Sequence, residues 1–327
     1  MKRVILRGPQ QVAFEDVPLH PDDVSDGQFY AETECSAVSI GTETAAYLGH
    51  PPLRPGTGYP RVVGYCNVAR VRRIRGRPEG VSVGDRIFTC QAHQSAFIAS
   101  PREVLAVIPD SLSPSAASLT YLAQLGLAAL QKAAFQPGER VAVLGLGVIG
   151  LATVQVATVL GAQVVALGNS ELRIRKAEEL GARAAFRSDD PQLASRVAAA
   201  TGGAGIDVLI TTANSWEAWR VALEITRPQG RIAVLGFPGR SEGPPTWNPL
   251  DSAWFYAKQL SLLAVGDVPA PALERNMGRL LQLMAEGRLP LERLLTHRVP
   301  WQALGQIYEL ASRKDKALIG AVLEWDA

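Results

Sequence analysis

The sequence predicts an α/β protein of two domains, one built on a doubly wound parallel sheet and the other rich in β-strands. Three observations support this prediction. The chain has 327 residues, which is enough for two domains of ordinary size. Its first third consists of short alternating runs separated by Gly and Pro, a pattern typical of half-buried strands. From about Ser113 onward, apolar runs alternate with helical segments, which indicates a parallel sheet covered on both faces.

In the β-rich part we expect strands within residues 3–6, 62–71 and 85–90. The segment 51–60 is rich in Pro and Gly and is therefore expected to form a loop or lid. A run of arginines surrounds Gly76, and two interpretations stay open: a solvated strand-and-turn face, or a site for an anionic substrate. The arginines of this run are Arg70, Arg72, Arg73, Arg75 and Arg77.

The alternating part begins with an Ala- and Leu-rich helical segment from Ser113 to Ala134, which Pro137 and Gly138 end. We expect strands at 140–144, 164–167, 208–211, 232–235 and 260–265, with helices at 148–160, 172–180 and 216–226. A helix at 280–286 and a final strand at 318–323 are expected to return to the β-rich domain. The predicted boundaries are therefore 1–112 for the β-rich domain, 113–267 for the parallel-sheet domain and 268–327 for the return.

Composition and charge exclude several classes of protein. Apolar residues make up 47% of the chain and charged residues 20%, and the formal net charge is +2. This balance favours a globular protein and gives no bulk field that would attract nucleic acid or a membrane surface. No apolar run reaches the roughly 18–20 residues that cross a bilayer, and the first residues lack the pattern of a signal peptide. The three cysteines show no CxxC spacing, so we expect a cytoplasmic protein without disulfides.

Gly145, Gly147 and Gly150 form a GxGxxG pattern between an expected strand and an expected helix. In that context the pattern indicates a dinucleotide site. The first Gly permits a tight turn, the second lets the backbone approach a pyrophosphate, and the third allows close packing of helix on strand. Val148 and Ile149 lie within the motif and are included among the candidate cofactor-binding residues.

The end of the second expected strand lacks the Asp or Glu that usually binds the ribose hydroxyls of NAD. A carboxylate there would repel a 2′-phosphate, whereas an arginine can pair with it. This position therefore favours NADP(H), although Arg173 has the alternative role of an exposed helix residue. The remaining candidate cofactor-binding residues are Gly168, Asn169, Ser170 and Arg173, followed farther along the chain by Thr211, Gly236 and Val265.

Several short motifs together resemble the medium-chain dehydrogenase/reductase family over almost the whole chain. They are Gly41-Thr42-Glu43, Gly64-Tyr65, Val83-Gly84-Asp85-Arg86, Gly145 to Gly150, Gly230-Arg231-Ile232 and Thr296-His297-Arg298. The resemblance implies a GroES-like catalytic domain for the β-rich part, a Rossmann domain for the parallel sheet, and oxidoreductase activity. The N-terminal third is further similar to the branch that contains bacteriochlorophyllide a dehydrogenases, on Ser39 to Glu43, Pro55 to Pro60 and Gly64-Tyr65. The pigment substrate of that branch is not implied for this chain.

Zinc-dependent relatives carry a Cys before the Gly-Thr-acid turn, a His-Glu pair after the later Gly, and a Cys or Asp on the helix before the nucleotide domain. The resemblance places Ile40, Tyr65-Cys66 and Tyr121 at these positions. Isoleucine has no donor atom and tyrosine is a rare zinc ligand. The four-Cys zinc lobe of the family is also missing from the sequence, so we expect no metal site.

Hydride transfer belongs to the nicotinamide, so the protein must position the substrate and handle one proton. Tyr65 and Tyr121 replace metal ligands in the resemblance, and their hydroxyls are candidates to stabilise a developing alkoxide; filling the vacated space is the alternative. Thr42 matches the hydroxyl residue that relays the substrate proton in the family, with local backbone bonding as its alternative. His93 is a fourth catalytic candidate, because histidine transfers protons near neutral pH, although a lone histidine is more often structural.

The resemblance leaves two reactions open for an NADP-dependent enzyme. One is interconversion of a secondary alcohol and a ketone on a small organic substrate, which the N-terminal segment favours. The other is reduction of an activated C=C bond in a quinone or enone. A non-catalytic NADPH-binding protein is a third hypothesis. We also expect a homodimer, from the family resemblance and because the apolar run 260–265 would otherwise form an exposed sheet edge.

Overall fold

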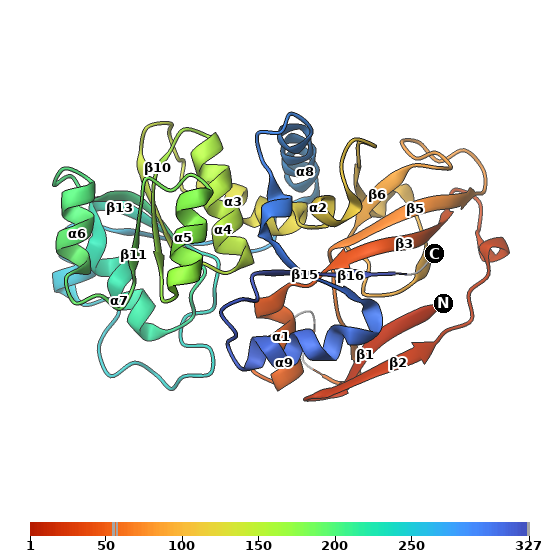
Figure 1. Ribbon diagram of the computed structural model, residues 1–327, viewed down its shortest axis with the longest axis horizontal. Coiled ribbons are helices and arrows are strands. Elements are labelled where there is room, and N and C mark those ends of the chain that lie inside the picture. Colours follow the sequence, from red (N-terminus) through yellow and green to blue (C-terminus); the bar gives the residue numbers. More distant parts are fainter. Residues whose placement is uncertain (54–55, 57, 326–327) are drawn as a thin grey trace. The chain divides into compact units, whose positions relative to one another are not determined.

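A computed structural model describes residues 1–53, 56 and 58–325. Arg54, Pro55 and Thr57 of the expected Pro- and Gly-rich loop lie outside the described residues. The chain divides into two compact units: residues 1–121 with 270–327 form unit 1, and residues 122–269 form unit 2 (Figure 1). The segment 113–121, which the sequence analysis assigns to the parallel-sheet domain, belongs to unit 1.

Unit 2 contains a six-stranded sheet in which every strand pair is parallel. Its strand order is β11 (Ala184–Arg187), β10 (Gln163–Gly168), β9 (Arg140–Leu144), β12 (Ile206–Thr211), β13 (Thr226–Val234) and β14 (Ser261–Ala264). The chain starts in the middle at β9, moves outward to β11, and then returns to build the other half from β12. This is the order of a doubly wound sheet, and it confirms the predicted fold class.

Four helices connect these strands: α4 (Val148–Val159), α5 (Glu171–Glu179), α6 (Leu193–Ala200) and α7 (Trp216–Ile225). Right-handed crossovers place α4 and α5 on one face of the sheet and α6 and α7 on the other, and each pair is in contact. Gly161 and Gly181, at φ +87° and +102°, follow α4 and α5 and allow the turn that ends each helix. The helix α3 (Thr120–Lys132) spans the boundary between the units.

The sequence analysis did not predict β11 and α6. The strand β11 has four residues at the sheet edge, and α6 has eight residues of which only Leu193 and Val197 are buried. Such short elements carry too few periodic apolar positions to be recognised from local sequence.

Unit 1 holds two sheets, and the C-terminal segment completes the larger one. The small sheet has the order β2 (Gln11–Asp16), β1 (Lys2–Gly8) and β4 (Arg61–Val62). The large sheet has the order β15 (Leu295–Pro300), β16 (Gly320–Glu324), β3 (Phe29–Ala37), β5 (Asn67–Ile74), β6 (Arg86–Thr89) and β8 (Val104–Val107), with β7 (Ala96–Ala99) also paired to β3. Because β16 pairs antiparallel with β3, residues from both ends of the chain share one sheet.

The helices of unit 1 are α1 (Ile40–Leu48), α2 (Pro114–Ser118), α8 (Ala270–Ala285) and α9 (Leu304–Ser312). Short 3₁₀ turns lie at η1 (Pro21–Asp23), η2 (Pro101–Glu103), η4 (Leu291–Leu294) and η5 (Trp301–Ala303), and a π-helical turn, η3 (Ser252–Tyr256), lies in unit 2. The Gly41-Thr42-Glu43 segment, expected as a turn, is the first turn of α1. The helix expected at 280–286 begins earlier, at Ala270.

Two further expectations concern the surface. Arg70 and Arg72 on β5 pair with Glu34 and Glu32 on β3, at 2.6 and 2.7 Å. Two of the five arginines are thus paired with carboxylates of the adjacent strand, and Arg73 pairs with Asp22, which favours the solvated-face interpretation. Within the described part of the chain, no helix combines the length and the apolar composition needed to span a bilayer.

Candidate functional site

The candidate cofactor residues of unit 2 lie along one edge of the sheet. Strand register aligns Leu167, Leu144, Thr211, Val234 and Ala264 in a single row near the carboxyl ends of β10, β9, β12, β13 and β14. Gly168, Gly145 and Val265 each follow this row by one residue, and Gly236 follows it by two. The strand order reverses between β9 and β12, and in open α/β sheets ligands bind beyond the carboxyl ends at such a point.

The three motif glycines differ in their surroundings: neighbouring atoms crowd Gly145 and Gly150, whereas none lies close to Gly147. Gly145 has φ +97°, and a Cβ there would lie 2.5 Å from the Thr212 hydroxyl. Gly147 caps α4, and a Cβ there would meet no atom within 4 Å. A Cβ on Gly150 would overlap the carbonyl oxygen of Gly145. Gly150 thus brings α4 against β9, whereas Gly147 leaves open space before the helix N-terminus, where N–H groups without helical partners can bind a phosphate.

The end of β10 is shaped by a contact that the sequence analysis missed. A Cβ on Gly168 would lie 2.8 Å from Leu146, so this position has little room for a side chain. Ser170 is buried at the N-terminus of α5, and Arg173 lies in the first turn of that helix. Arg187 is the register partner of Gly168 on β11, and it pairs with Asp189 at 2.7 Å and Glu171 at 3.5 Å. The two elements next to Gly168 therefore each carry an arginine, Arg173 on α5 and Arg187 on β11.

In the other half of the sheet, small and polar residues surround the strand ends. The Thr211 hydroxyl accepts a hydrogen bond from the Ala213 N–H at 3.3 Å, and the Thr212 hydroxyl donates to the Gly145 carbonyl at 3.0 Å. A Cβ on Gly236 would lie 2.7 Å from the Asn214 side-chain oxygen. These contacts tie β9, β12 and the segment after β13 together at the carboxyl edge.

In unit 1, three of the four candidate catalytic residues lie together. The Tyr65 hydroxyl donates to the Ser39 hydroxyl and also hydrogen-bonds Thr42. Tyr121 places its ring against Tyr65 in an edge-to-face arrangement, with 5.4 Å between ring centroids. Burial raises the pKa of the Tyr65 phenol well above its usual range, so the phenol is neutral and can donate a hydrogen bond throughout the neutral pH range.

His93, the fourth candidate, is buried behind this group. Its Nε2 lies 2.9 Å from Oε2 of Glu43, and its Nδ1 lies 2.8 Å from the Ser36 hydroxyl. Glu43 also accepts hydrogen bonds from the Ser39 N–H at 2.7 Å and from the Tyr308 hydroxyl at 2.8 Å. With no exposed surface, His93 is placed to organise the site rather than to meet a substrate directly.

The positions that the resemblance assigns to metal ligands hold Ile40, Tyr65, Cys66 and Tyr121. Cys66 is fully buried, and burial raises the pKa of its thiol well above the usual value. Among residues 1–53, 56 and 58–325, no three His, Cys, Asp or Glu side chains gather as a metal site.

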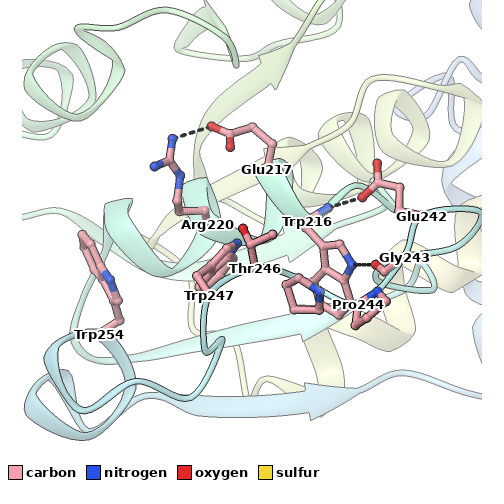
Figure 2. A pocket seen from close by; sticks show the side chains of 10 residues that line it. Trp216, Glu217, Arg220, Glu242, Gly243, Pro244, Thr246, Trp247 and Trp254 are labelled. Carbon is pink, nitrogen blue, oxygen red and sulfur yellow. Dashed lines mark hydrogen bonds and ion pairs between the residues drawn. The ribbon is translucent and has the colours of Figure 1, made fainter.

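A pocket of about 730 Å³ lies elsewhere in unit 2, between α7 and the segment before η3. Figure 2 shows indole and proline rings along it, with Arg220 paired to Glu217 at 2.9 Å. The Trp216 backbone N–H binds Glu242 at 2.9 Å, and its indole N–H binds the Gly243 carbonyl at 2.8 Å. None of the sequence-predicted cofactor residues lines this pocket.

Comparison with known proteins places the chain in a family. Residues 148–277 match a family model described as zinc-binding dehydrogenase. The chain is 30% identical over 276 residues to sorbitol dehydrogenase from Bacillus subtilis, which covers 75% of this chain and 77% of that protein. The galactitol-1-phosphate dehydrogenase structure from Escherichia coli superposes with a TM-score of 0.84 at 18% identity, over 99% of this chain and 100% of the other.

The chain belongs to the medium-chain dehydrogenase/reductase family. It is therefore an oxidoreductase of that family. The narrower resemblance in the N-terminal third has only a partial counterpart. The 2-desacetyl-2-hydroxyethyl bacteriochlorophyllide A dehydrogenase of Cereibacter sphaeroides is 36% identical over 86 residues, 26% of each chain. The family model matches this chain only from residue 148 onward. The match therefore does not include Ile40, Tyr65 or Tyr121.

The second and third glycines of the motif provide a test of the nucleotide site. Gly147→Ala is expected to leave the melting temperature unchanged, because its Cβ meets open space, while weakening nicotinamide dinucleotide binding about tenfold or more. Gly150→Ala is expected to destabilise the fold by about 1–3 kcal/mol, because α4 must move away from Gly145. Thermal melts and cofactor titrations of both variants measure these effects. Unchanged cofactor affinity in Gly147→Ala would contradict the assignment.

Proposed function

We propose that this chain is an NADP(H)-dependent, zinc-independent dehydrogenase that interconverts a secondary alcohol and a ketone on a small organic substrate. The observation that carries the proposal is the hydroxyl cluster of Tyr65, Ser39 and Thr42, in which a neutral phenol stands at a position that the resemblance assigns to a metal ligand. The full-length fold of polyol and alcohol dehydrogenases supports the reaction class.

The carboxyl edge of unit 2 would hold the cofactor, with its pyrophosphate at the N-terminus of α4 beside Gly147. The nicotinamide supplies or accepts the hydride when it is bound. Open space at Gly147 and the close approach of Gly150 to Gly145 fit a dinucleotide, because they leave room for a phosphate while fixing the helix.

The Tyr65 hydroxyl would stabilise the charge that develops on the substrate oxygen. Its proton points to Ser39 in the described structure, and rotation about the C–O bond redirects it without moving the ring. In ketone reduction the phenol donates to the forming alkoxide and then gives up the proton. The hydroxyls of Ser39 and Thr42 would hydrogen-bond the phenolate that remains, and a proton from water, relayed through these hydroxyls, would restore the neutral phenol. Alcohol oxidation runs through the same contacts in reverse.

Replacing Tyr65 by Phe keeps the ring and its contact with Tyr121, and removes only the hydroxyl. The turnover rate is expected to fall about a hundredfold or more, because one donor to an oxyanion contributes roughly 3–4 kcal/mol to transition-state stabilisation. Cofactor affinity should not change. Tyr30→Phe serves as a control, since Tyr30 is a buried tyrosine that packs in a separate cluster with Val24 and Ala96. Steady-state rates and cofactor titrations measure the effect, and nearly full activity in Tyr65→Phe would reduce this residue to a space-filling role.

NADP(H) is the proposed cofactor because Gly168 carries no ribose-binding carboxylate, has little room for one, and is followed by arginines on α5 and flanked by Arg187 on β11. The wild-type protein is expected to bind NADPH more tightly than NADH. Arg173→Ala should lose about 1.5–3 kcal/mol of NADPH binding, a tenfold to hundredfold change, with little effect on NADH. Arg175→Ala, on the exposed face of the same helix, is the matched control. Equal affinity of the wild type for both cofactors would refute this preference.

Zinc independence is proposed because the side chains at the expected ligand positions do not fit the ion. Ile40 offers no donor atom, the Cys66 thiol is held protonated by burial, and the Tyr65 hydroxyl is engaged by two other hydroxyls. Purified protein is expected to contain no stoichiometric zinc and to keep its activity in chelators. Elemental analysis that finds one bound zinc per chain, together with activity lost to chelators, would reject the proposal.

A homodimer through unit 2 is proposed from the edge of its sheet, and a cytoplasmic location from the three free cysteines, which fit a reducing compartment. Strand β14 pairs only with β13 among the described strands, and Leu250 and Tyr256 before it are 55% and 79% exposed. A second copy would cover these groups and the free strand edge. Light scattering at micromolar concentration is expected to give twice the chain mass, and Tyr256→Glu should shift the protein toward monomer. A wild-type monomer under these conditions would count against a dimer.

A further inference from the structure

A buried network of side chains lies behind Tyr65. Glu43 is 2% exposed, and His93 and Tyr308 have no exposed surface. A buried carboxylate is costly unless hydrogen bonds surround it. Glu43 receives three: Oε1 accepts from the Ser39 N–H, while Oε2 accepts from the Tyr308 hydroxyl and faces His93 Nε2. The donors come from the start of α1, from α9 and from the segment after β6.

The hydrogen atoms of this network can be assigned from a residue that only donates. The Trp325 indole N–H lies 2.9 Å from the Ser36 hydroxyl, so the Ser36 oxygen must accept this bond. The remaining Ser36 hydrogen can then be donated to His93 Nδ1 at 2.8 Å. With Nδ1 as acceptor, Nε2 carries the hydrogen of a neutral imidazole and donates it to Glu43. In an imidazolium, Nδ1 of His93 would also carry a hydrogen and would donate it to the Ser36 oxygen. The Ser36 hydroxyl hydrogen could then no longer be donated to His93.

Two contacts connect the network to Tyr65. Glu43 holds the Ser39 backbone N–H, and the Ser39 hydroxyl accepts the phenol hydrogen of Tyr65. His93 also packs against Gly64, the residue before Tyr65, so closely that a Cβ there would lie 2.6 Å from the imidazole. Both the acceptor of the phenol hydrogen and the backbone that carries the phenol are therefore fixed by the same buried pair.

We propose that Glu43, His93 and Tyr308 are positioning residues that hold Ser39 and Tyr65 in register for proton transfer, with Glu43 ionised and His93 neutral in its Nε2–H tautomer. The positioning role rests on the proposed function of Tyr65, whereas the tautomer does not. Tyr308 lies 265 residues from Glu43 in the sequence, so α9 at the end of the chain controls the geometry of a site built from its beginning.

The tautomer is tested by nitrogen NMR of protein labelled with ¹⁵N-histidine. The chain has four histidines, so His93 can be assigned by comparison with His93→Gln. Wild-type protein at pH 7 should show His93 neutral and protonated at Nε2. In Glu43→Gln, one orientation of the amide presents a donor to His93, which should shift the imidazole to the Nδ1–H tautomer. The other orientation presents a donor to the Ser39 N–H. An imidazolium or an Nδ1–H tautomer in the wild type would overturn the assignment.

The positioning role is tested by a double-mutant cycle between Tyr308 and Tyr65. Tyr308→Phe removes one hydrogen bond to Glu43 and should lower kcat about threefold to tenfold, with an unchanged KM for cofactor. In the Tyr65→Phe background the same change should have no further effect, because the group that it positions is gone. Tyr47→Phe is the matched control, since the Tyr47 ring packs on Tyr308 at 5.1 Å.

The outcomes of the cycle separate the two proposals. Additive losses in the cycle would mean that Tyr308 acts only on stability, and would overturn the positioning role. Full activity of Tyr65→Phe would instead overturn the proposed function, and with it the positioning role. The tautomer of His93 is tested by NMR independently of this result.

Discussion

A carboxylate taken out of water needs hydrogen-bond donors, and in unit 1 this need joins segments from across the chain. Glu43 obtains its donors from Ser39, His93 and Tyr308. One of these donors is held in turn, because His93 hydrogen-bonds Ser36 and Ser36 accepts a hydrogen bond from the Trp325 indole. Loss of any one donor would leave a buried charge partly uncompensated. The packing of α1, α9 and the segment after β6 around one acidic side chain is therefore a requirement of electrostatics as much as of apolar burial.

Unit 2 depends on steric constraints of a different kind. Gly150 allows α4 to lie against the turn after β9, and Gly168 gives space to Leu146. Gly147 differs, because nothing in the chain occupies the space beside it. The distinction separates glycines that the fold requires from one that contacts within the chain do not require. The reversal of strand order between β9 and β12 places that open space where doubly wound sheets bind their ligands.

In the proposed chemistry, unit 2 binds the cofactor and unit 1 stabilises the substrate oxygen. The carboxyl edge of unit 2 offers backbone N–H groups and arginines, which suit phosphates. Unit 1 offers a phenol that burial keeps neutral, together with two hydroxyls that can share its proton. A metal ion stabilises a developing alkoxide by its charge, whereas a phenol does so by a hydrogen bond and can also deliver the proton. Replacing ligand side chains by hydroxyls thus changes how the alkoxide is stabilised without changing the hydride chemistry.

Local sequence determined the strands and helices of unit 2 other than β11 and α6, together with the position of its glycine turn. Continuous apolar runs and Gly or Pro signals are properties of neighbouring residues. The family resemblance, rather than local pattern, pointed to Tyr65, Thr42 and Tyr121, which the structure brings together. Only the tertiary structure decided that His93 is buried against Glu43, that Arg187 lies beside Gly168, and that Tyr308 and Trp325 complete the network. These contacts join residues up to 289 positions apart, and no local pattern encodes them because chain folding alone sets which distant side chains meet.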